Sequence, residues 1–196
     1  MTRGNEKEIL IVGFGGQGIV LTGNILGKAA TLHDKRHATM TQSYGPEARG
    51  GSCSAQVMIS DEEIPFPYVE NPQVLICMSQ EGFDKNVTSL IKGGLLIWDT
   101  DLVSTHNLDE SWVRYNVPAT RFAEELGNKM MTNILMLGFL SAVTDVVSED
   151  GLIRAVLSSV PPKTKEKNRA AFERGREYGK EIIKSHAMKD KRPETL

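Results

Sequence analysis

The chain has 196 residues, a length that fits one compact domain and is too short for two unrelated large domains. Hydrophobic residues make up 40% and charged residues 24%, as in ordinary soluble globular proteins, which excludes a wholly disordered, collagen-like or coiled-coil chain. The formal net charge of -2 gives no general attraction to nucleic acids or anionic membranes, so neither is an expected partner.

The two cysteines, Cys53 and Cys77, lie far apart and outside any CxxC spacing. They cannot supply the four thiolates of an iron–sulfur cluster or a structural zinc site, and their apolar surroundings predict buried side chains in a reducing compartment. The N-terminus lacks the apolar run of a signal peptide. The most apolar stretch, residues 130–147, contains polar residues that favour a buried helix over a membrane span. We therefore expect a cytoplasmic protein that binds no metal.

The first elements form the opening of a nucleotide-binding type unit. EILIVG at residues 8–13 predicts a buried strand, GFGGQG a loop, and the apolar periodicity of residues 19–32 a helix. A second strand is expected at residues 37–41 and a third at residues 52–60. Because the connection between these two strands is too short for a crossover helix, the pairing is expected to be antiparallel.

Residues 61–72, DEEIPFPYVENP, contain three prolines and predict an extended surface loop whose aromatics, Phe66 and Tyr68, are available to a neighbouring chain. Strands are then expected at residues 73–79, 93–100 and 112–117, and helices at residues 81–91, 117–126, 129–147, 149–159 and 165–184. In the last helix, Gly175 and Gly179 reduce helix propensity and therefore suggest that another element approaches closely there.

The predicted fold class is α/β: a Rossmann-like three-layer domain with a mixed, mostly parallel sheet and C-terminal helices. Residues 1–186 are expected to form this single domain, and residues 187–196 a flexible tail.

Gly13, Gly15 and Gly18 form a GxGxxG pattern between a strand and a helix. The free N–H groups at the start of the helix favour a phosphate or carboxylate, and Gln17 adds an amide at the mouth of the loop. The alternative is a tight turn in which the glycines serve packing alone. Residues 39–43 lack the acidic side chain that would bind a ribose, which disfavours NAD or FAD.

The second loop, SYGPEARGG, follows the second strand, so it should lie at the same sheet edge as the glycine loop and face the same cleft. Arg49 offers a planar fork for phosphate or carboxylate, and Tyr44 can stack on a ring. The alternative is a structural turn closed by a Glu47–Arg49 pair. No nucleophile has a recognisable base, and His33 and His37 straddle a helix end, which argues against a metal site.

The segments GFGGQGIVLTGNILGKAA and SYGPEARGGSCSAQVMISDEEIPFP resemble the gamma subunit, or gamma-type domain, of the 2-oxoacid:ferredoxin oxidoreductases. The resemblance runs from about residue 8 to residue 183, through QVLICMSQEGFDK to PPKTKEKNRAAFERGREYGKE. It implies an enzyme that decarboxylates a 2-oxoacid on thiamine diphosphate, passes electrons through iron–sulfur clusters to ferredoxin and releases an acyl-coenzyme A. The alpha, beta and ferredoxin-like partner chains would hold the thiamine diphosphate and the clusters, which agrees with the two cysteines of this chain.

The resemblance associates the gamma-type domain with subunit assembly and with coenzyme A, assigns no catalytic residue to this chain, and implies that the isolated chain is inactive. YGPEARGG and a short separate gamma chain favour 2-oxoglutarate as the substrate. The alternatives are an enzyme for pyruvate or a branched-chain 2-oxoacid, a purely structural adaptor, and an independent NAD(P)-dependent oxidoreductase. The candidates for lining the coenzyme A region are Gly15, Gly16, Gln17, Gly18, Tyr44, Arg49, Gly50 and Gly51.

Overall fold

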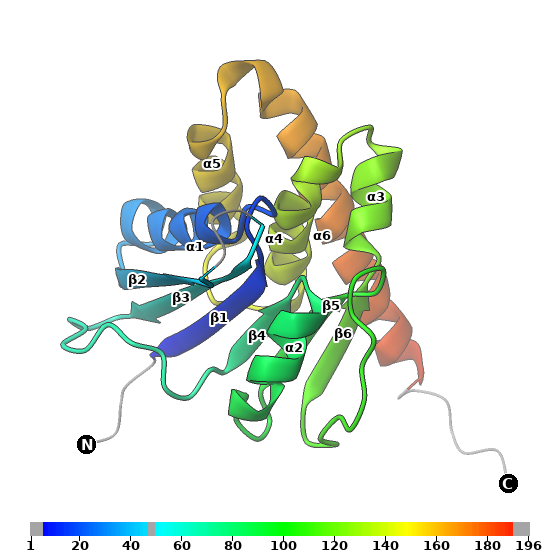
Figure 1. Ribbon diagram of the computed structural model, residues 1–196. Coiled ribbons are helices and arrows are strands. Elements are labelled where there is room, and N and C mark those ends of the chain that lie inside the picture. Colours follow the sequence, from blue (N-terminus) through cyan, green and yellow to red (C-terminus); the bar gives the residue numbers. More distant parts are fainter. Residues whose placement is uncertain (1–5, 47–49, 190–196) are drawn as a thin grey trace, which may run out of the picture.

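A computed structural model of the chain describes residues 6–46 and 50–189, with side chains as far as residue 185. Its centre is a six-stranded sheet with the strand order β2-β3-β1-β4-β5-β6 (Figure 1). The strands are β1 (Lys7–Phe14), β2 (His37–Tyr44), β3 (Ser52–Ser60), β4 (Val74–Cys77), β5 (Leu95–Asp99) and β6 (Val113–Val117).

The sheet is mixed and mostly parallel, as predicted. β4 pairs in parallel with β1 and with β5, and β5 pairs in parallel with β6. β3 runs antiparallel to β2, because only residues 45–51 separate the two strands. It also pairs antiparallel with β1. The antiparallel prediction for residues 52–60 is therefore confirmed.

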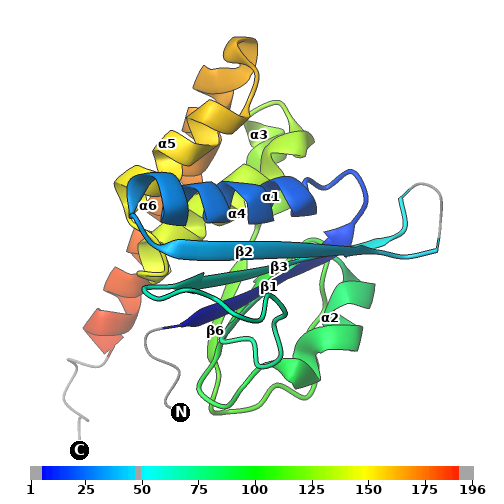
Figure 2. The same ribbon diagram turned by 90° about the vertical axis from the view of Figure 1, so that its left-hand side faces the viewer.

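Helices cover both faces of the sheet and complete the three layers. Figures 1 and 2 show α1, α3, α4, α5 and α6 on one face and α2 on the other. The α-helices are α1 (Ile19–Lys28), α2 (Gln80–Asn86), α3 (Ala119–Glu125), α4 (Thr132–Val143), α5 (Glu149–Ser159) and α6 (Lys165–Lys189). A π-helical turn (Ala29–His33) follows α1, and single 3-10 turns cover Val87–Ser89, Lys129–Met131 and Pro162–Thr164. Each face of the sheet carries its own buried hydrophobic cluster, consistent with the Rossmann-like class.

Several element boundaries differ from the sequence-based expectation. β2 continues to Tyr44 because the whole of its length pairs with β3. The helix predicted for residues 129–147 starts as a 3-10 turn and ends at Val143, where Thr144 adopts an extended backbone. Helix α6 runs to Lys189, so residues 187–189, expected in the tail, are helical. Residues 190–196 of the expected tail lie outside the described residues.

Helices α4 and α6 pack backbone to backbone, as the glycines of the last helix predicted. A Cβ atom on Gly175 would lie 2.0 Å from the carbonyl oxygen of Leu135, and one on Gly179 would lie 2.7 Å from the Cβ of Ala142. Residues 132–140 of α4 are all buried between the sheet and its neighbouring helices. Among the residues that the structure describes, no helix combines the length and apolar character needed to cross a membrane.

Candidate functional site

The glycine loop begins where β1 ends, at the carboxyl edge of the parallel strands. Gly16 has a φ of +97° and Gly18 a φ of +75°, a left-handed backbone conformation that favours glycine. Gly18 is also packed, because a Cβ atom there would lie 2.4 Å from Nδ2 of Asn133. Gly16 is exposed, and a Cβ atom added to it would meet nothing within 4 Å. Packing against Asn133 therefore explains why residue 18 is a glycine. Gly16, in contrast, leaves open space at the mouth of the loop.

The glycine loop and the β2–β3 hairpin are in direct contact, which confirms the prediction that both loops share one rim. The backbone N–H of Gly15 donates to the carbonyl oxygen of Gly51 at 2.8 Å. A Cβ atom on Gly15 would lie 3.4 Å from the backbone nitrogen of Gly50. The loop glycines therefore allow two chain segments to meet at their backbones.

One side of this contact opens into a cleft of about 280 Å³, here called the hairpin cleft. The first turn of α1 faces it, and the first helical hydrogen bond in that turn runs from the Thr22 N–H to the Gly18 carbonyl. The N–H groups that precede Thr22 have no partner within the helix, and residues 19–22 contain no acidic side chain. The first turn of α1 therefore favours an anionic group at the base of the cleft. Its lining comprises Phe14, Gly15, Gly16, Gly18, Ile19, Val20, Leu21, Tyr44 and Cys53.

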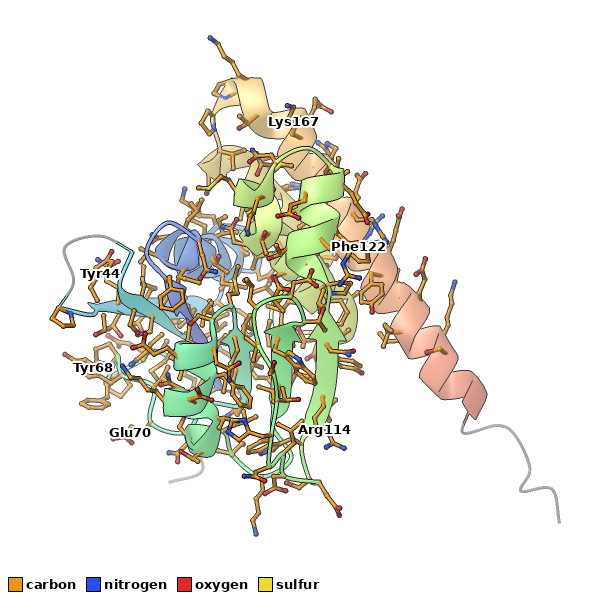
Figure 3. The ribbon with its side chains drawn as sticks, turned by 45° about the vertical axis from the view of Figure 1, so that its right-hand side comes forward. Tyr44, Tyr68, Glu70, Arg114, Phe122 and Lys167 are labelled. Atoms are coloured by element: carbon orange, nitrogen blue, oxygen red, sulfur yellow. The ribbon has the colours of Figure 1, made fainter. Side chains whose placement is uncertain are left out.

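Tyr44 stands at the end of β2 and is 61% exposed, so its ring is open to a ligand beside the first turn of α1. Figure 3 shows this side chain projecting from the edge of the sheet. Gly50 is exposed and has a φ of +69°, and Gly51 supplies the carbonyl that accepts from Gly15. Arg49 and Glu47, which the sequence analysis singled out, lie outside the described residues.

The other side of the glycine loop opens into a smaller cleft of about 120 Å³, here called the switch cleft. It is bordered by Gly16 and Gln17 after β1 and by Met78 after β4. The chain turns from β1 to α1 on one face of the sheet and from β4 to α2 on the other (Figure 1). This topological switch point is where open α/β sheets place their ligands. The cleft is lined by Gly16, Gln17, Met78, Leu102, Thr120, Lys129, Met130 and Thr132.

Gln17 joins the loop to the chain just after β4 and lines the switch cleft. Its Oε1 accepts from the Phe14 N–H at 2.6 Å, and its Nε2 donates to the carbonyl oxygen of Met78 at 2.8 Å. The sequence predicts this amide at the mouth of the loop, where a ligand could bind. In the structure both ends of the amide bind the protein, so Gln17 holds the loop in shape and fixes one wall of the switch cleft.

Asp99, which the sequence analysis missed, positions a second wall of the switch cleft. Its fully buried carboxylate accepts from the hydroxyl of Thr120 at 2.6 Å, from the Thr120 N–H at 2.9 Å and from the Asp101 N–H at 3.0 Å. Burial raises the pKa of Asp99 despite these hydrogen bonds. The only sequence signal was an acidic residue that ends a buried strand.

The cysteines are buried and free, as predicted, and burial raises the pKa of both thiols, with the nearby Asp84 carboxylate adding to the effect at Cys77. Among the side chains that the structure describes, residues 6–46 and 50–185, no three His, Cys, Asp or Glu side chains gather as metal ligands would. Asp34, the acidic residue nearest to a ribose-binding position, accepts instead from the Ser148 N–H at 2.7 Å.

The glycine loop, the switch point and the two-sided helical cover define a doubly wound, Rossmann-like α/β domain. The chain belongs to the pyruvate ferredoxin/flavodoxin oxidoreductase family, whose family model matches residues 8–178. It is 49% identical over 179 residues to the 2-oxoglutarate synthase subunit KorC of Methanocaldococcus jannaschii, covering 90% of this chain and 96% of that protein.

Two solved structures share the fold. The gamma subunit of a keto/oxoacid ferredoxin oxidoreductase from Geobacter sulfurreducens superimposes with a TM-score of 0.77 and 38% identity, covering 88% of this chain and 98% of the other. The 2-oxoglutarate:ferredoxin oxidoreductase of Magnetococcus marinus, solved with 2-oxoglutarate, coenzyme A and succinyl-CoA bound, matches with a TM-score of 0.82. Its identity is 21%, and the match covers 90% of this chain and 31% of that one, so this likeness concerns the fold alone.

Proposed function

We propose that this chain is the gamma subunit of a 2-oxoglutarate:ferredoxin oxidoreductase, which converts 2-oxoglutarate and coenzyme A into succinyl-CoA and carbon dioxide while reducing ferredoxin. The observation that carries the proposal is the 49% identity to a 2-oxoglutarate synthase subunit of nearly the same extent. Identity to the pyruvate synthase subunit PorC of Methanothermobacter marburgensis is 31%, which favours 2-oxoglutarate over pyruvate.

The chemistry is divided between this chain and its partners. Decarboxylation needs thiamine diphosphate, and electron transfer needs iron–sulfur clusters, which four thiolates usually hold. This chain has two cysteines, each buried on a different strand. In our proposal the alpha and beta subunits hold thiamine diphosphate and a ferredoxin-like subunit holds the clusters.

The role of this chain is to contact coenzyme A at the rim formed by its two loops. The hairpin cleft fits such a ligand because the open N–H groups of α1 suit a phosphate and the exposed ring of Tyr44 suits an adenine base. Arg49 is placed by the sequence on the same hairpin and would add a fork of N–H donors. Gln17 acts in this scheme through the loop that it shapes. The residues proposed to line the site are Gly15, Gly16, Gly18, Tyr44, Arg49, Gly50 and Gly51.

A structural adaptor remains the second candidate, and specific contacts favour it. Gly18 packs against Asn133, and a Cβ on Gly13 would lie 2.5 Å from Oε1 of Gln17, so part of the glycine pattern serves packing. An independent NAD(P) enzyme is disfavoured, because β2 ends in Gln42, Ser43 and Tyr44 without an acidic side chain.

The proposal is tested by expressing the chain together with the other subunits of its enzyme and purifying the complex. We expect reduction of a viologen dye that requires both 2-oxoglutarate and coenzyme A, and no activity from the isolated chain. Activity of the isolated chain, or a preference for pyruvate, would overturn the proposal.

Arg49→Ala in the assembled complex separates the coenzyme A role from the adaptor role. A Michaelis constant for coenzyme A that rises about tenfold, with subunit content unchanged, supports ligand contact. Tyr44→Ala should raise the same constant and Tyr44→Phe should not, since stacking needs only the ring. Unchanged kinetics in all three variants would favour the adaptor.

A further inference from the structure

The loop that joins β3 to β4 is held firmly at its ends and projects in its middle. Residues 61–73 form neither helix nor strand, yet the Glu62 N–H donates to the hydroxyl of Ser60 at 3.1 Å, and the Val69 N–H donates to Oε1 of Gln56 at 3.1 Å. These bonds fix where the loop leaves the sheet and where it returns.

The buried carboxylate of Glu8 also fixes the loop. Glu8 on β1 is 3% exposed, and its Oε2 accepts from the Glu70 N–H at 2.8 Å and the Asn71 N–H at 2.7 Å. Burying a carboxylate is costly unless it is well bonded, and here the bonds go to the backbone of the loop. Glu8 on strand β1 therefore stabilises this conformation of the loop.

The middle of the loop displays an aromatic pair. Phe66 is 50% exposed and Tyr68 is 54% exposed, and their ring centroids lie 5.2 Å apart. Figure 3 shows Tyr68 at the outer edge of the molecule. Pro65 and Pro67 restrict the backbone around Phe66, so little conformational entropy remains to be lost when the rings are covered. Exposed aromatics on a preorganised backbone are typical of the centre of a protein–protein interface.

The charge of residues 61–72 indicates what kind of surface binds the rings of Phe66 and Tyr68. Residues 61–72 contain four carboxylates, at Asp61, Glu62, Glu63 and Glu70, and no Lys or Arg. Arg36 from outside the loop pairs with Asp61 at 2.7 Å. The exposed Glu62 and Glu63 precede the aromatic pair, so an acidic flank adjoins an apolar centre. An anionic membrane, a nucleic acid or the same loop of a second copy would meet like charge.

We propose that residues 61–72 dock into a basic-rimmed apolar recess on another subunit of the same enzyme, with Phe66 and Tyr68 in the recess and Glu62 and Glu63 facing Lys or Arg side chains. This inference rests on the proposed function, because it requires an assembled enzyme. Glu8 acts as a positioning residue that holds the loop for docking.

The test measures the affinity of this full chain for the complex of its remaining subunits by sedimentation. Phe66→Ala/Tyr68→Ala should weaken association by about tenfold or more. Leu32→Ala is the matched control, because Leu32 is 69% exposed on the turn after α1 and should leave the affinity unchanged. Glu62→Lys/Glu63→Lys replaces exposed side chains without disturbing the aromatic pair, and should weaken association most at low salt.

The outcomes separate this inference from the proposed function. Should the aromatic and charge-reversal variants both bind with the affinity of the unaltered chain while the assembled enzyme oxidises 2-oxoglutarate, the docking inference is wrong and the proposed function stands. The docking inference would also be wrong if the isolated chain self-associates and the Phe66→Ala/Tyr68→Ala variant does not. The aromatic pair would then bind a second copy of this chain. An unaltered chain that binds no partner subunit would overturn both.

Discussion

Gly138 of α4 and Phe172 of α6 touch so closely that a Cβ atom on Gly138 would lie 1.9 Å from the carbonyl oxygen of Phe172. The same helix pair meets again at Gly175, opposite Leu135. Since the obstacles at both positions are backbone atoms, a side chain at either glycine requires the helices to separate. Helix α4 is buried from residue 132 to residue 140, so its displacement would disturb the helical layer above the glycine loop.

The first prediction concerns this contact. Gly138→Ala should lower the free energy of unfolding by about 3 kcal/mol, because the backbone cannot yield as a flexible side chain could. Gly27→Ala, in an open position of α1, should instead raise it by about 0.5–1 kcal/mol through helix propensity. Urea unfolding followed by circular dichroism measures both, and equal stability of the two variants would contradict the packing argument.

The second prediction concerns Gln17. Gln17→Glu removes the donor to the Met78 carbonyl and places a carboxylate against that oxygen, so it should cost about 2 kcal/mol of unfolding free energy at neutral pH. Part of the loss should return at a pH that protonates the new carboxyl, which can then donate. The same change at the exposed Gln42 is the control and should be nearly neutral. A loss at neutral pH that persists unchanged in acid would argue against the hydrogen bond as the cause.

The third prediction concerns the pH dependence of stability. Burial raises the pKa of Asp99 in the folded chain above its unfolded value of about 3.9, so the folded state binds this proton more tightly. The contribution of Asp99 to stability should therefore increase as the pH falls through the raised pKa, and should level off below the unfolded pKa. We expect the stability difference between the unaltered chain and Asp99→Asn to shift in favour of the unaltered chain between neutral pH and about pH 4.

Asp109 provides a control of opposite sign. It is exposed, and hydrogen bonds from Ser111 lower its pKa, so its contribution is present at neutral pH and is lost as the pH falls through the lowered value. Comparing Asp99→Asn and Asp109→Asn by urea unfolding across the acid range should give pH trends of opposite direction. Trends of the same direction would refute the assignment for Asp99.

The fourth prediction concerns the two thiols. Burial raises the pKa of Cys53 and of Cys77, so neither should be alkylated by iodoacetamide in the folded chain, and both should react in concentrated urea. Cys53 borders the hairpin cleft whereas Cys77 is fully buried, so Cys53 should be the first to react during partial opening. Mass spectrometry of the labelled peptides measures this order, and rapid labelling of Cys77 in the native chain would contradict the structure.

Local sequence patterns predicted much of the fold. The apolar run of β1, the glycines after it and the periodicity of α1 are short-range features, and the brief connection after β2 left β3 only an antiparallel pairing. The contact of Gly51 with Gly15 arises from a different pairing, that of β3 with β1, whose register it continues beyond Phe14 and Ser52. The sequence therefore predicted that the two loops share one edge of the sheet but not their direct contact, and the contact of any ligand with them stays a prediction.

The sequence by itself determined the class of fold and the position of each loop at the end of a strand, because both depend on patterns within short stretches of the chain. Its motifs also carried the family resemblance. Only the tertiary structure decided that Gln17 binds Met78, that Asp99 binds Thr120 and that Glu8 holds the loop after β3. The partners of Gln17 and Glu8 lie 61 and 62 residues further along the chain. The sequence does not show whether a polar side chain forms its hydrogen bonds with a ligand or with a distant backbone group. Only folding brings such distant groups within hydrogen-bond distance.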